Sequence, residues 1–226
     1  MPAGSGLPAG CDRHTAALPL RCTAALDRGP ARGLPCAHLD PHPRCAAAET
    51  AGAEVEYLSL CDLNIADCQA CDYCWEHGTC RIEDDFQQIL PKLLTVDRLI
   101  FATPIFFMSV CGQGKLLIDR GQCLWARKYV LKQPVSPDAV AHRRAMVIAV
   151  GATRSTKMFD CVRLTMKYWL DALDMDYAMN LFVNQTDARR AILEHPSAMQ
   201  QAARLGRELV APADPTFPEP VEVELF

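Results

Sequence analysis

The pattern of hydrophobic and polar positions changes abruptly near residue 49. Residues 1–48 contain no Val, Ile, Phe, Tyr or Trp, the residue types that favour β-strands. Seven prolines in the same stretch, at positions 2, 8, 19, 30, 35, 41 and 43, interrupt any long helix. We therefore expect an atypical, mostly irregular N-terminal segment over residues 1–48.

From residue 49 onward, apolar runs alternate with stretches of helical periodicity. Strands are predicted over residues 54–60, 98–103, 144–150 and 177–183, and helices over residues 84–95, 114–128, 158–173 and 187–210. Pro91 is expected to kink or restart the first of these helices. Alternating strands and helices predict an α/β domain over residues 49–211, with a parallel sheet covered on both faces. An extended, proline-rich tail follows over residues 212–226.

Composition and charge exclude several classes of protein. Of the 226 residues, 50% are hydrophobic, which is enough for one sizeable core. The net charge of −4 gives no basic field, so we expect no nucleic-acid partner. No apolar run is long enough to cross a membrane, and the N-terminus has no signal-peptide pattern. We therefore expect a cytoplasmic protein with no membrane partner.

Four cysteines follow one another in the spacing C-x2-C-x2-C-x5-C. They are Cys68, Cys71, Cys74 and Cys80, and residues 68–80 are called the cysteine loop below. Thiolates are soft ligands that suit iron–sulfur clusters, and a cubane cluster needs four of them. The pattern therefore favours an iron–sulfur cluster, and with it electron transfer.

Two other interpretations of the cysteine loop stay open. Zinc is the main inorganic rival, although structural zinc sites more often pair two C-x2-C knuckles across a longer insertion. The thiols are otherwise four ordinary reduced cysteines. The chain has twelve cysteines and no export signal, which favours thiols or metal ligands over disulfides. The other cysteines of the domain are expected to be small buried hydrophobic residues: Cys61, Cys111, Cys123 and Cys161.

Three segments are expected at the carboxyl ends of the strands, where open α/β sheets bind ligands. They are the cysteine loop, residues 103–108 and residues 151–155. The second segment presents apolar and aromatic side chains and backbone amides that suit a flat heteroaromatic ring: Thr103, Pro104, Ile105, Phe106, Phe107 and Met108. The competing interpretation is that these aromatic residues belong to the core.

A family resemblance is carried by three groups of residues. They are Ala-Gly-Ala-Glu-Val-Glu at 51–56, the cysteine loop closed by Asp84, Asp85 and Phe86, and Ala-Thr-Pro-Ile-Phe-Phe at 102–107 with Gly112, Lys115, Asp119 and Arg120 after it. From about residue 49 to 181, the chain resembles the flavodoxin-like, NADPH-dependent FMN reductase superfamily, and specifically its iron–sulfur flavoprotein branch. The resemblance implies a three-layer sandwich with a parallel sheet of order 2-1-3-4-5, bound FMN, NAD(P)H as a reductant, and dimers or tetramers with flavins near the subunit interface.

The resemblance also assigns residues to each cofactor. Residues 103–108 would lie along the FMN ring, and Gly151, Ala152 and Thr153 would approach it from the next strand. The four cysteines of the cysteine loop would hold a 4Fe-4S cluster close to the flavin.

The beginning of the chain departs from the family pattern. Family members open with a hydrophobic strand and a phosphate loop, in which backbone amides and hydroxyls bind the FMN phosphate. Ser5 and Thr15 are the candidates here, but only three residues precede Gly4. We therefore expect the first, central strand to be missing or degenerate, as a shifted reading frame or a degraded gene start would produce.

The leading interpretation is a flavin-dependent oxidoreductase or electron-transfer protein with FMN and a 4Fe-4S cluster, which exchanges electrons with a ferredoxin-like partner. One alternative is an NAD(P)H-dependent FMN or quinone reductase without a cluster. The other is a zinc-bound or cofactorless binding module of the same fold.

Overall fold

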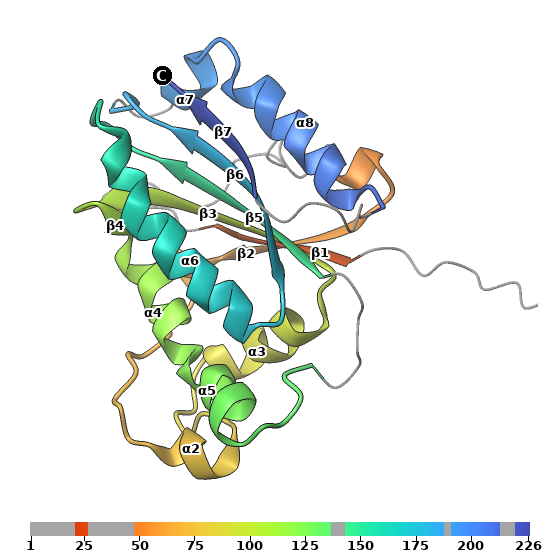
Figure 1. Cartoon of the computed structure of the whole chain (residues 1–226), viewed down its shortest axis with the longest axis vertical. Helices are drawn as coiled ribbons and strands as arrows, with labels where there is room; N and C mark the ends of the chain where they lie inside the picture. The colour runs from red at the N-terminus through yellow and green to blue at the C-terminus, as the bar shows by residue number, and fades with distance from the viewer. Residues whose placement is uncertain (1–20, 27–47, 137–142, 188–190, 213–219) are drawn as a thin grey trace, which may run out of the picture.

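The protein forms a mostly parallel β-sheet with helices on both faces. The computed structural model describes residues 21–26, 48–136, 143–187, 191–212 and 220–226. Within them the sheet runs in the order β2-β1-β3-β5-β6-β7, with all neighbours parallel (Figure 1). The strands are β1 (Arg21–Leu26), β2 (Glu54–Ser59), β3 (Arg98–Phe106), β5 (Arg144–Val150), β6 (Asp176–Val183) and β7 (Val221–Leu225). A short strand, β4 (Ser109–Val110), pairs antiparallel with β3.

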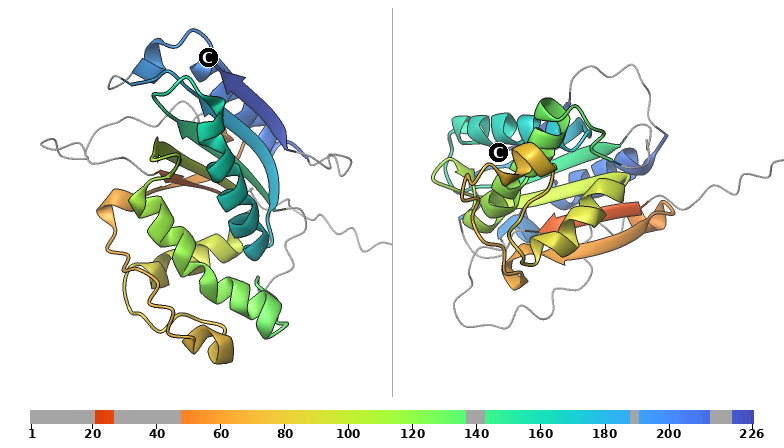
Figure 2. Two further views of the ribbon diagram at one scale, coloured as in Figure 1. Left: turned by 60° about the vertical axis from the view of Figure 1, so that its left-hand side comes forward. Right: turned by 90° about the horizontal axis from the view of Figure 1, so that it is seen from below.

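The helices lie in two layers. Their bounds are α2 (Tyr73–His77), α3 (Phe86–Thr95), α4 (Gly112–Arg120), α5 (Gln122–Trp125), α6 (Asp160–Ala172), α7 (Ala191–Glu194) and α8 (Ala198–Val210), with short turns at η1 (Leu60–Asp62), η2 (Ala126–Val130) and η3 (Thr156–Phe159). Along β3, Leu99 and Phe101 join the core beneath α3, α4 and α6, whereas Ile100 joins the core beneath α8. This alternation produces the three layers (Figure 2), and the predicted α/β fold is confirmed.

The central strand is the main departure from the sequence prediction. β1 lies between β2 and β3, with Ala24 opposite both Tyr57 and Ile100. Residues 1–48 were expected to contain no strand because they lack β-branched aliphatic and aromatic side chains. Pairing with a strand on each side supplies the backbone hydrogen bonds, so tertiary context outweighs weak local propensity. The first strand is therefore present.

The C-terminal tail also joins the sheet. β7 extends the parallel edge beyond β6, with Leu181 opposite Val223. Arg163 on α6 holds this strand through ion pairs with Glu222, at 2.8 Å, and with Glu224. The end of the segment expected to be a simple extended tail is thus an edge strand with charged side chains, which discourage further strand pairing.

Several helices differ in detail from their predicted extents. The last predicted helix divides into α7 and α8 around Pro196, which lacks a backbone N–H. The predicted helix over 114–128 divides into α4, α5 and a π-helical turn, η2. α3 runs through Pro91 without ending there.

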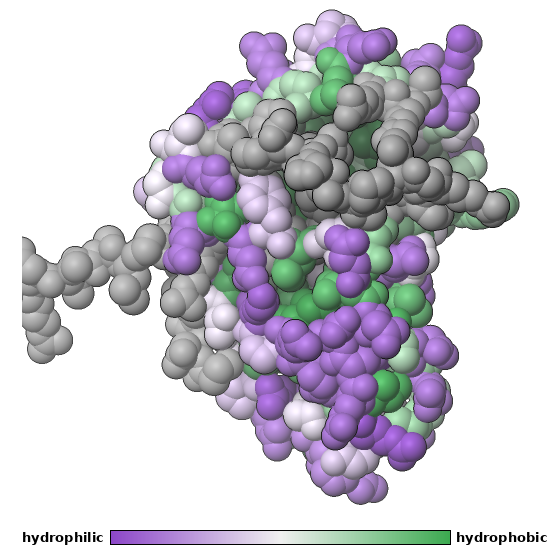
Figure 3. All heavy atoms as spheres, turned by 180° about the vertical axis from the view of Figure 1, so that it is seen from behind, coloured by the Kyte–Doolittle hydropathy of each residue, from purple (hydrophilic) through white to green (hydrophobic). Residues whose placement is uncertain are grey.

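No helix of the described residues is both long and apolar enough to cross a bilayer. Seen from behind, hydrophilic residues gather over the lower half of the molecule, with smaller hydrophobic areas between them (Figure 3).

A buried arginine joins the ends of two helices below the sheet. Arg143 is 3% exposed and donates Nε to the Val96 carbonyl at 2.9 Å and Nη1 to the Leu173 carbonyl at 2.6 Å. It also donates to the Leu93 carbonyl. The last carbonyls of a helix have no partner within the helix and carry partial negative charge. One guanidinium therefore satisfies the carboxyl ends of both α3 and α6.

Replacing Arg143 with Met should strongly destabilise the fold. Each buried carbonyl left unpaired costs about 1–3 kcal/mol, so we expect the free energy of unfolding to fall by at least about 3 kcal/mol. Chemical denaturation measures this change. The matched control, Arg207→Met on the exposed face of α8, should stay within about 0.5 kcal/mol of wild type. Equal stability of the two variants would contradict the role assigned to Arg143.

Candidate functional site

The four cysteines of the cysteine loop line one cavity. Cys68, Cys71, Cys74 and Cys80 border a space of about 320 Å³. Helix α2, which belongs to the cysteine loop, lies at the lower end of the molecule (Figure 1). The wall of the cavity is completed by the carboxyl end of α4 and by α5. Within the described residues, no three or more His, Cys, Asp or Glu side chains are arranged to hold a single metal ion.

The backbone of the cysteine loop explains why the thiols share a cavity. Ala70 and Asp72 flank Cys71 and both have left-handed backbone conformations, with φ of 47° and 54°. Gly78, with φ of 66°, ends α2 and donates its N–H to the Cys74 carbonyl at 2.9 Å. These three reversals turn the chain around the thiols. A Cβ at Gly78 would also come within 3.2 Å of the Leu131 side chain, so glycine fits there for two reasons.

A buried ion pair fixes the cysteine loop to α4. Arg120 and Asp84 have side chains that are 0% and 5% exposed, and Arg120 Nη1 lies 2.5 Å from Asp84 Oδ2. Asp84 also accepts the backbone N–H groups of Ala66 at 2.8 Å and Phe86 at 3.0 Å. Arg120 donates to the carbonyls of Ala66 at 3.2 Å and Ile82 at 3.1 Å. The segments before and after the cysteine loop are therefore both held by the Asp84–Arg120 pair.

Hydrogen bonds keep Asp84 and Arg120 charged despite their burial. Burial opposes the charge on Asp84, but the hydrogen bond from Arg120 and two backbone N–H groups outweigh it and hold the pKa of that carboxyl below its ordinary value. Arg120 also stacks over the Phe86 ring, with its guanidinium carbon 4.6 Å from the ring centroid. Both groups are therefore charged at neutral pH.

The thiols influence one another. Burial raises the pKa of Cys74, and the charges of Cys68, Cys80 and Cys71 raise it further. Burial raises the pKa of Cys123 to about 12, with Cys80 and Cys74 adding to the effect. A raised pKa keeps Cys74 and Cys123 protonated as thiols at neutral pH, and a bound metal displaces the protons of its cysteine ligands. Because the four thiols share a cavity but are not gathered around a single ion within the described residues, this set of soft donors suits a group of several metal atoms that takes one thiolate for each.

Sequence reasoning missed the contribution of Cys123 to this cavity. Its thiol lines the cavity as a fifth cysteine and donates to the Arg120 carbonyl at 3.3 Å. Cys123 follows Arg120 by three residues within the predicted helix over residues 114–128, and residues at this spacing share one face of a helix. This spacing was the signal that the sequence offered. Cys111 and Cys123 are buried, as expected, whereas Cys61 is half-buried. Cys161 is exposed on α6, so the prediction of burial was wrong for that residue.

The aromatic segment forms an exposed hairpin at the carboxyl end of β3. Phe106, Phe107 and Met108 are exposed, and the last two occupy the turn into β4 with φ of 49° and 64°. Two positive φ values are typical of a type I′ hairpin turn, but are rare and strained for bulky residues. Thr103 is buried beneath the hairpin and accepts the Cys111 N–H at 3.3 Å. These three exposed residues are thus not part of the core.

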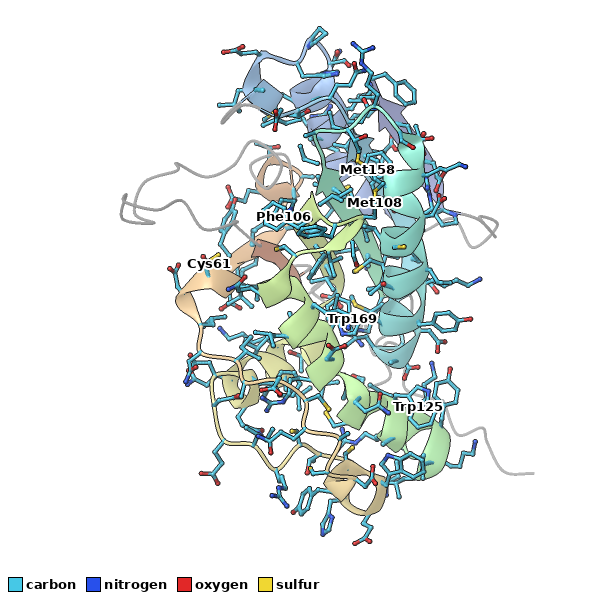
Figure 4. The ribbon with its side chains drawn as sticks, turned by 90° about the vertical axis from the view of Figure 1, so that its left-hand side faces the viewer. Cys61, Phe106, Met108, Trp125, Met158 and Trp169 are labelled. Carbon is cyan, nitrogen blue, oxygen red and sulfur yellow. The ribbon has the colours of Figure 1, made fainter. Side chains whose placement is uncertain are left out.

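The segment after β5 lies beside this hairpin. Pro104 pairs with Val150, so Gly151 follows directly at the same sheet edge, with Ala152 and Thr153 exposed beyond it. A Cβ at Gly151 would lie 2.6 Å from Met158 Sδ and 3.4 Å from Ile105 Cβ. Figure 4 shows Phe106, Met108 and Met158 near one another at this edge. The structure therefore brings residues 103–108 and 151–153 together.

The cysteines do not lie at that edge. The hairpin leads directly into the first residue of α4, whereas Asp119 and Arg120, at its other end, line the cysteine cavity. Nine helical residues span about 13 Å. Trp125, which packs near Trp75 of the cysteine loop, lies correspondingly far below Phe106 (Figure 4). The prediction that the cysteine loop shares the sheet edge with residues 103–108 was wrong, because residues 60–67 carry the chain away from β2. Ser5 and Thr15 lie outside the described residues.

Comparison with known proteins identifies the family. Residues 44–181 match NADPH-dependent FMN reductase, which covers more than half of the chain. An iron–sulfur flavoprotein of Methanocaldococcus jannaschii is 40% identical over 32% of this chain and 38% of its own length. An iron–sulfur flavoprotein of Archaeoglobus fulgidus is 33% identical over 47% of this chain and 50% of its own. The chain thus spans half or less of the length of these two relatives.

A solved structure supports the fold. An NAD(P)H:quinone oxidoreductase from Methanothermobacter marburgensis matches 87% of this chain and 99% of its own, with a TM-score of 0.62 and 13% identity. At that identity the likeness concerns the flavodoxin-like fold alone. Together with the match over residues 44–181, it leads to one conclusion: the chain belongs to the NADPH-dependent FMN reductase family.

Proposed function

We propose that the protein is a flavin-dependent oxidoreductase that uses FMN and a 4Fe-4S cluster. FMN would lie at the sheet edge formed by residues 103–108 and 151–153, and Cys68, Cys71, Cys74 and Cys80 would hold the cluster. The observation that carries the proposal is the cavity lined by all four thiols. Bound FMN supplies two-electron exchange with a reductant such as NAD(P)H, and the cluster supplies single-electron transfer.

The donor set supports the cluster. Four thiolates satisfy a cubane, which takes one from the protein for each iron. The left-handed residues around Cys71 and the Asp84–Arg120 pair fix the loop before any cofactor binds. Reduced thiols also suit a reducing compartment, so the proposal places the protein in the cytoplasm.

The sheet edge supports the flavin. The exposed side chains of Phe106, Phe107 and Met108 offer apolar surface to a planar ring and exclude water from one side of it. Gly151 lets the end of β5 pack directly against Met158 and Ile105, which sets the position of the neighbouring strand end beside the hairpin. The strained hairpin turn holds this surface in position without any ligand.

The separation of the two sites favours an oligomer. Within one chain, the cysteine cavity and the hairpin lie at opposite ends of α4. Three exposed aromatic residues lie beside the cavity: Trp75, Trp125 and Tyr129. The ring centroids of Trp75 and Trp125 are 6.0 Å apart, and those of Trp125 and Tyr129 are 5.9 Å apart. Exposed aromatic residues are enriched at protein interfaces. We therefore propose a dimer or tetramer in which these residues are covered.

Replacing Cys71 with Ala should remove the cluster and keep the flavin. Anaerobically purified wild-type protein should contain iron and acid-labile sulfide, and Cys71→Ala should lose both together with the broad visible absorbance of the cluster. The control Cys161→Ala, exposed on α6 away from the cavity, should keep them. Flavin without iron in the wild type would instead select the cluster-free reductase. Zinc without flavin would select the binding module.

Replacing Gly151 with Ala should weaken FMN binding. The new Cβ would lie 2.6 Å from Met158 Sδ, and because Met158 is fully buried, the methionine and the end of β5 must move apart. Because this displaces the edge at which we propose that FMN lies, we expect the FMN dissociation constant to rise about tenfold, measured by flavin fluorescence titration of apoprotein. The control Gly112→Ala meets no atom within 4 Å and should bind normally. Unchanged FMN affinity in Gly151→Ala would count against flavin at this edge.

A further inference from the structure

Arg120 is the buried charge on the wall of the cysteine cavity. Four charged residues line this cavity: Asp72, Arg81, Asp119 and Arg120. Asp72 and Arg81 are exposed, and the Asp119 side chain is 43% exposed and paired with Lys115 at 2.7 Å. Water and salt screen such charges. The Arg120 side chain is 0% exposed, so water screens its charge far less, and the opposing charge closest to it is the Asp84 carboxylate.

One hydrogen-bond donor of Arg120 is not used by the loop anchor. Nη1 and Nη2 donate to Asp84 and to the carbonyls of Ala66 and Ile82. Nε is buried and has no partner in hydrogen-bonding geometry within the described residues. An unpaired buried N–H is costly, so an acceptor that comes within reach of Nε is favoured.

Cys80 is the thiol beside this guanidinium. Arg120 Nη2 donates to the carbonyl of Ile82, two residues after Cys80, at 3.1 Å. Cys80 and Arg120 also line the same cavity, so the contact with Ile82 holds the chain around Cys80 next to Arg120. A thiolate bound to iron keeps lone pairs that accept hydrogen bonds, and such bonds tune the reduction potential of a cluster.

We propose, on the basis of the proposed function, that Arg120 is a positioning residue that donates its Nε–H to the Cys80 sulfur and raises the reduction potential of the cluster. An added electron makes the cluster more negative by one charge. A fixed positive charge nearby stabilises that reduced state more than the oxidised state. The step transfers one electron from the reductant, and no bond forms or breaks.

The choice of Arg over Lys follows from the geometry. The planar guanidinium has five donors in a rigid fork and stays charged in proteins. Two of its nitrogens can therefore hold Asp84 and the loop carbonyls while the third remains available for Cys80. A lysine would supply the same charge from a single nitrogen without this division.

The test compares two variants that remove opposite charges from the same ion pair. Arg120→Gln removes the positive charge, and we expect a more negative midpoint potential. Asp84→Asn keeps Arg120 but removes its neutralising carboxylate, and we expect a more positive potential. Anaerobic redox titration of the holoprotein, followed by the electron paramagnetic resonance signal of the reduced cluster, measures both. A purely structural anchor would not predict shifts of opposite sign.

Two further variants complete the experiment. Lys115→Gln makes the same charge change at an exposed position of the same helix and should leave the potential at the wild-type value. Arg120→Lys keeps the charge and should restore most of the potential lost in Arg120→Gln. If Arg120→Gln does not assemble a cluster, the shift in Asp84→Asn decides the question.

The outcomes separate this inference from the proposed function. Wild-type protein without iron and sulfide overturns the proposed function and this inference with it. A wild-type cluster whose potential is unchanged in Arg120→Gln, or shifts in the same direction in both variants, overturns the inference about Arg120 alone. Opposite shifts, with Lys115→Gln unchanged, support it.

Discussion

The buried ion pair between Asp84 and Arg120 is the constraint on which the lower half of the molecule depends. The cysteine loop contains little regular structure, so few backbone hydrogen bonds of its own hold it in place. Its two ends meet at one carboxylate and one guanidinium, both almost inaccessible to water. Breaking such a pair by removing one partner typically costs about 3–5 kcal/mol, because a buried charge is left alone. The position of all four thiols therefore follows from this contact.

The same solution, a buried arginine that satisfies several backbone carbonyls, recurs below the sheet. Arg143 joins the ends of α3 and α6, and Arg120 joins the ends of the cysteine loop. Each guanidinium has enough donors to serve separate segments at once. These two residues connect elements that are far apart in sequence. Each therefore contributes more to the stability of the tertiary fold than a packing contact between sequence neighbours would.

α4 determines how the two candidate sites relate. Its first residue, Gly112, comes shortly after the hairpin that joins β3 and β4, and its last residue is Arg120. A rigid helix between the two candidate sites fixes their separation within one chain. The proposed oligomer and the proposed role of Arg120 are both consequences of this arrangement. The proposed oligomer concerns the path by which electrons would leave the cysteine cavity. The proposed role of Arg120 concerns the reduction potential of a cluster bound there.

The sequence by itself determined most of the strands and helices after residue 49, because hydrophobic periodicity reports directly which faces are buried. It also identified the four cysteines as one group, since their spacing is local. It identified residues 103–108, at the end of β3, as a candidate binding segment. Only the tertiary structure decided that Arg21–Leu26 is the central strand, because its partners on both sides lie more than twenty-five residues away. Only the tertiary structure placed Arg120 and Cys123 against the cysteine loop and moved that loop away from the sheet edge. These facts depend on contacts between distant segments, which no local pattern of residues encodes.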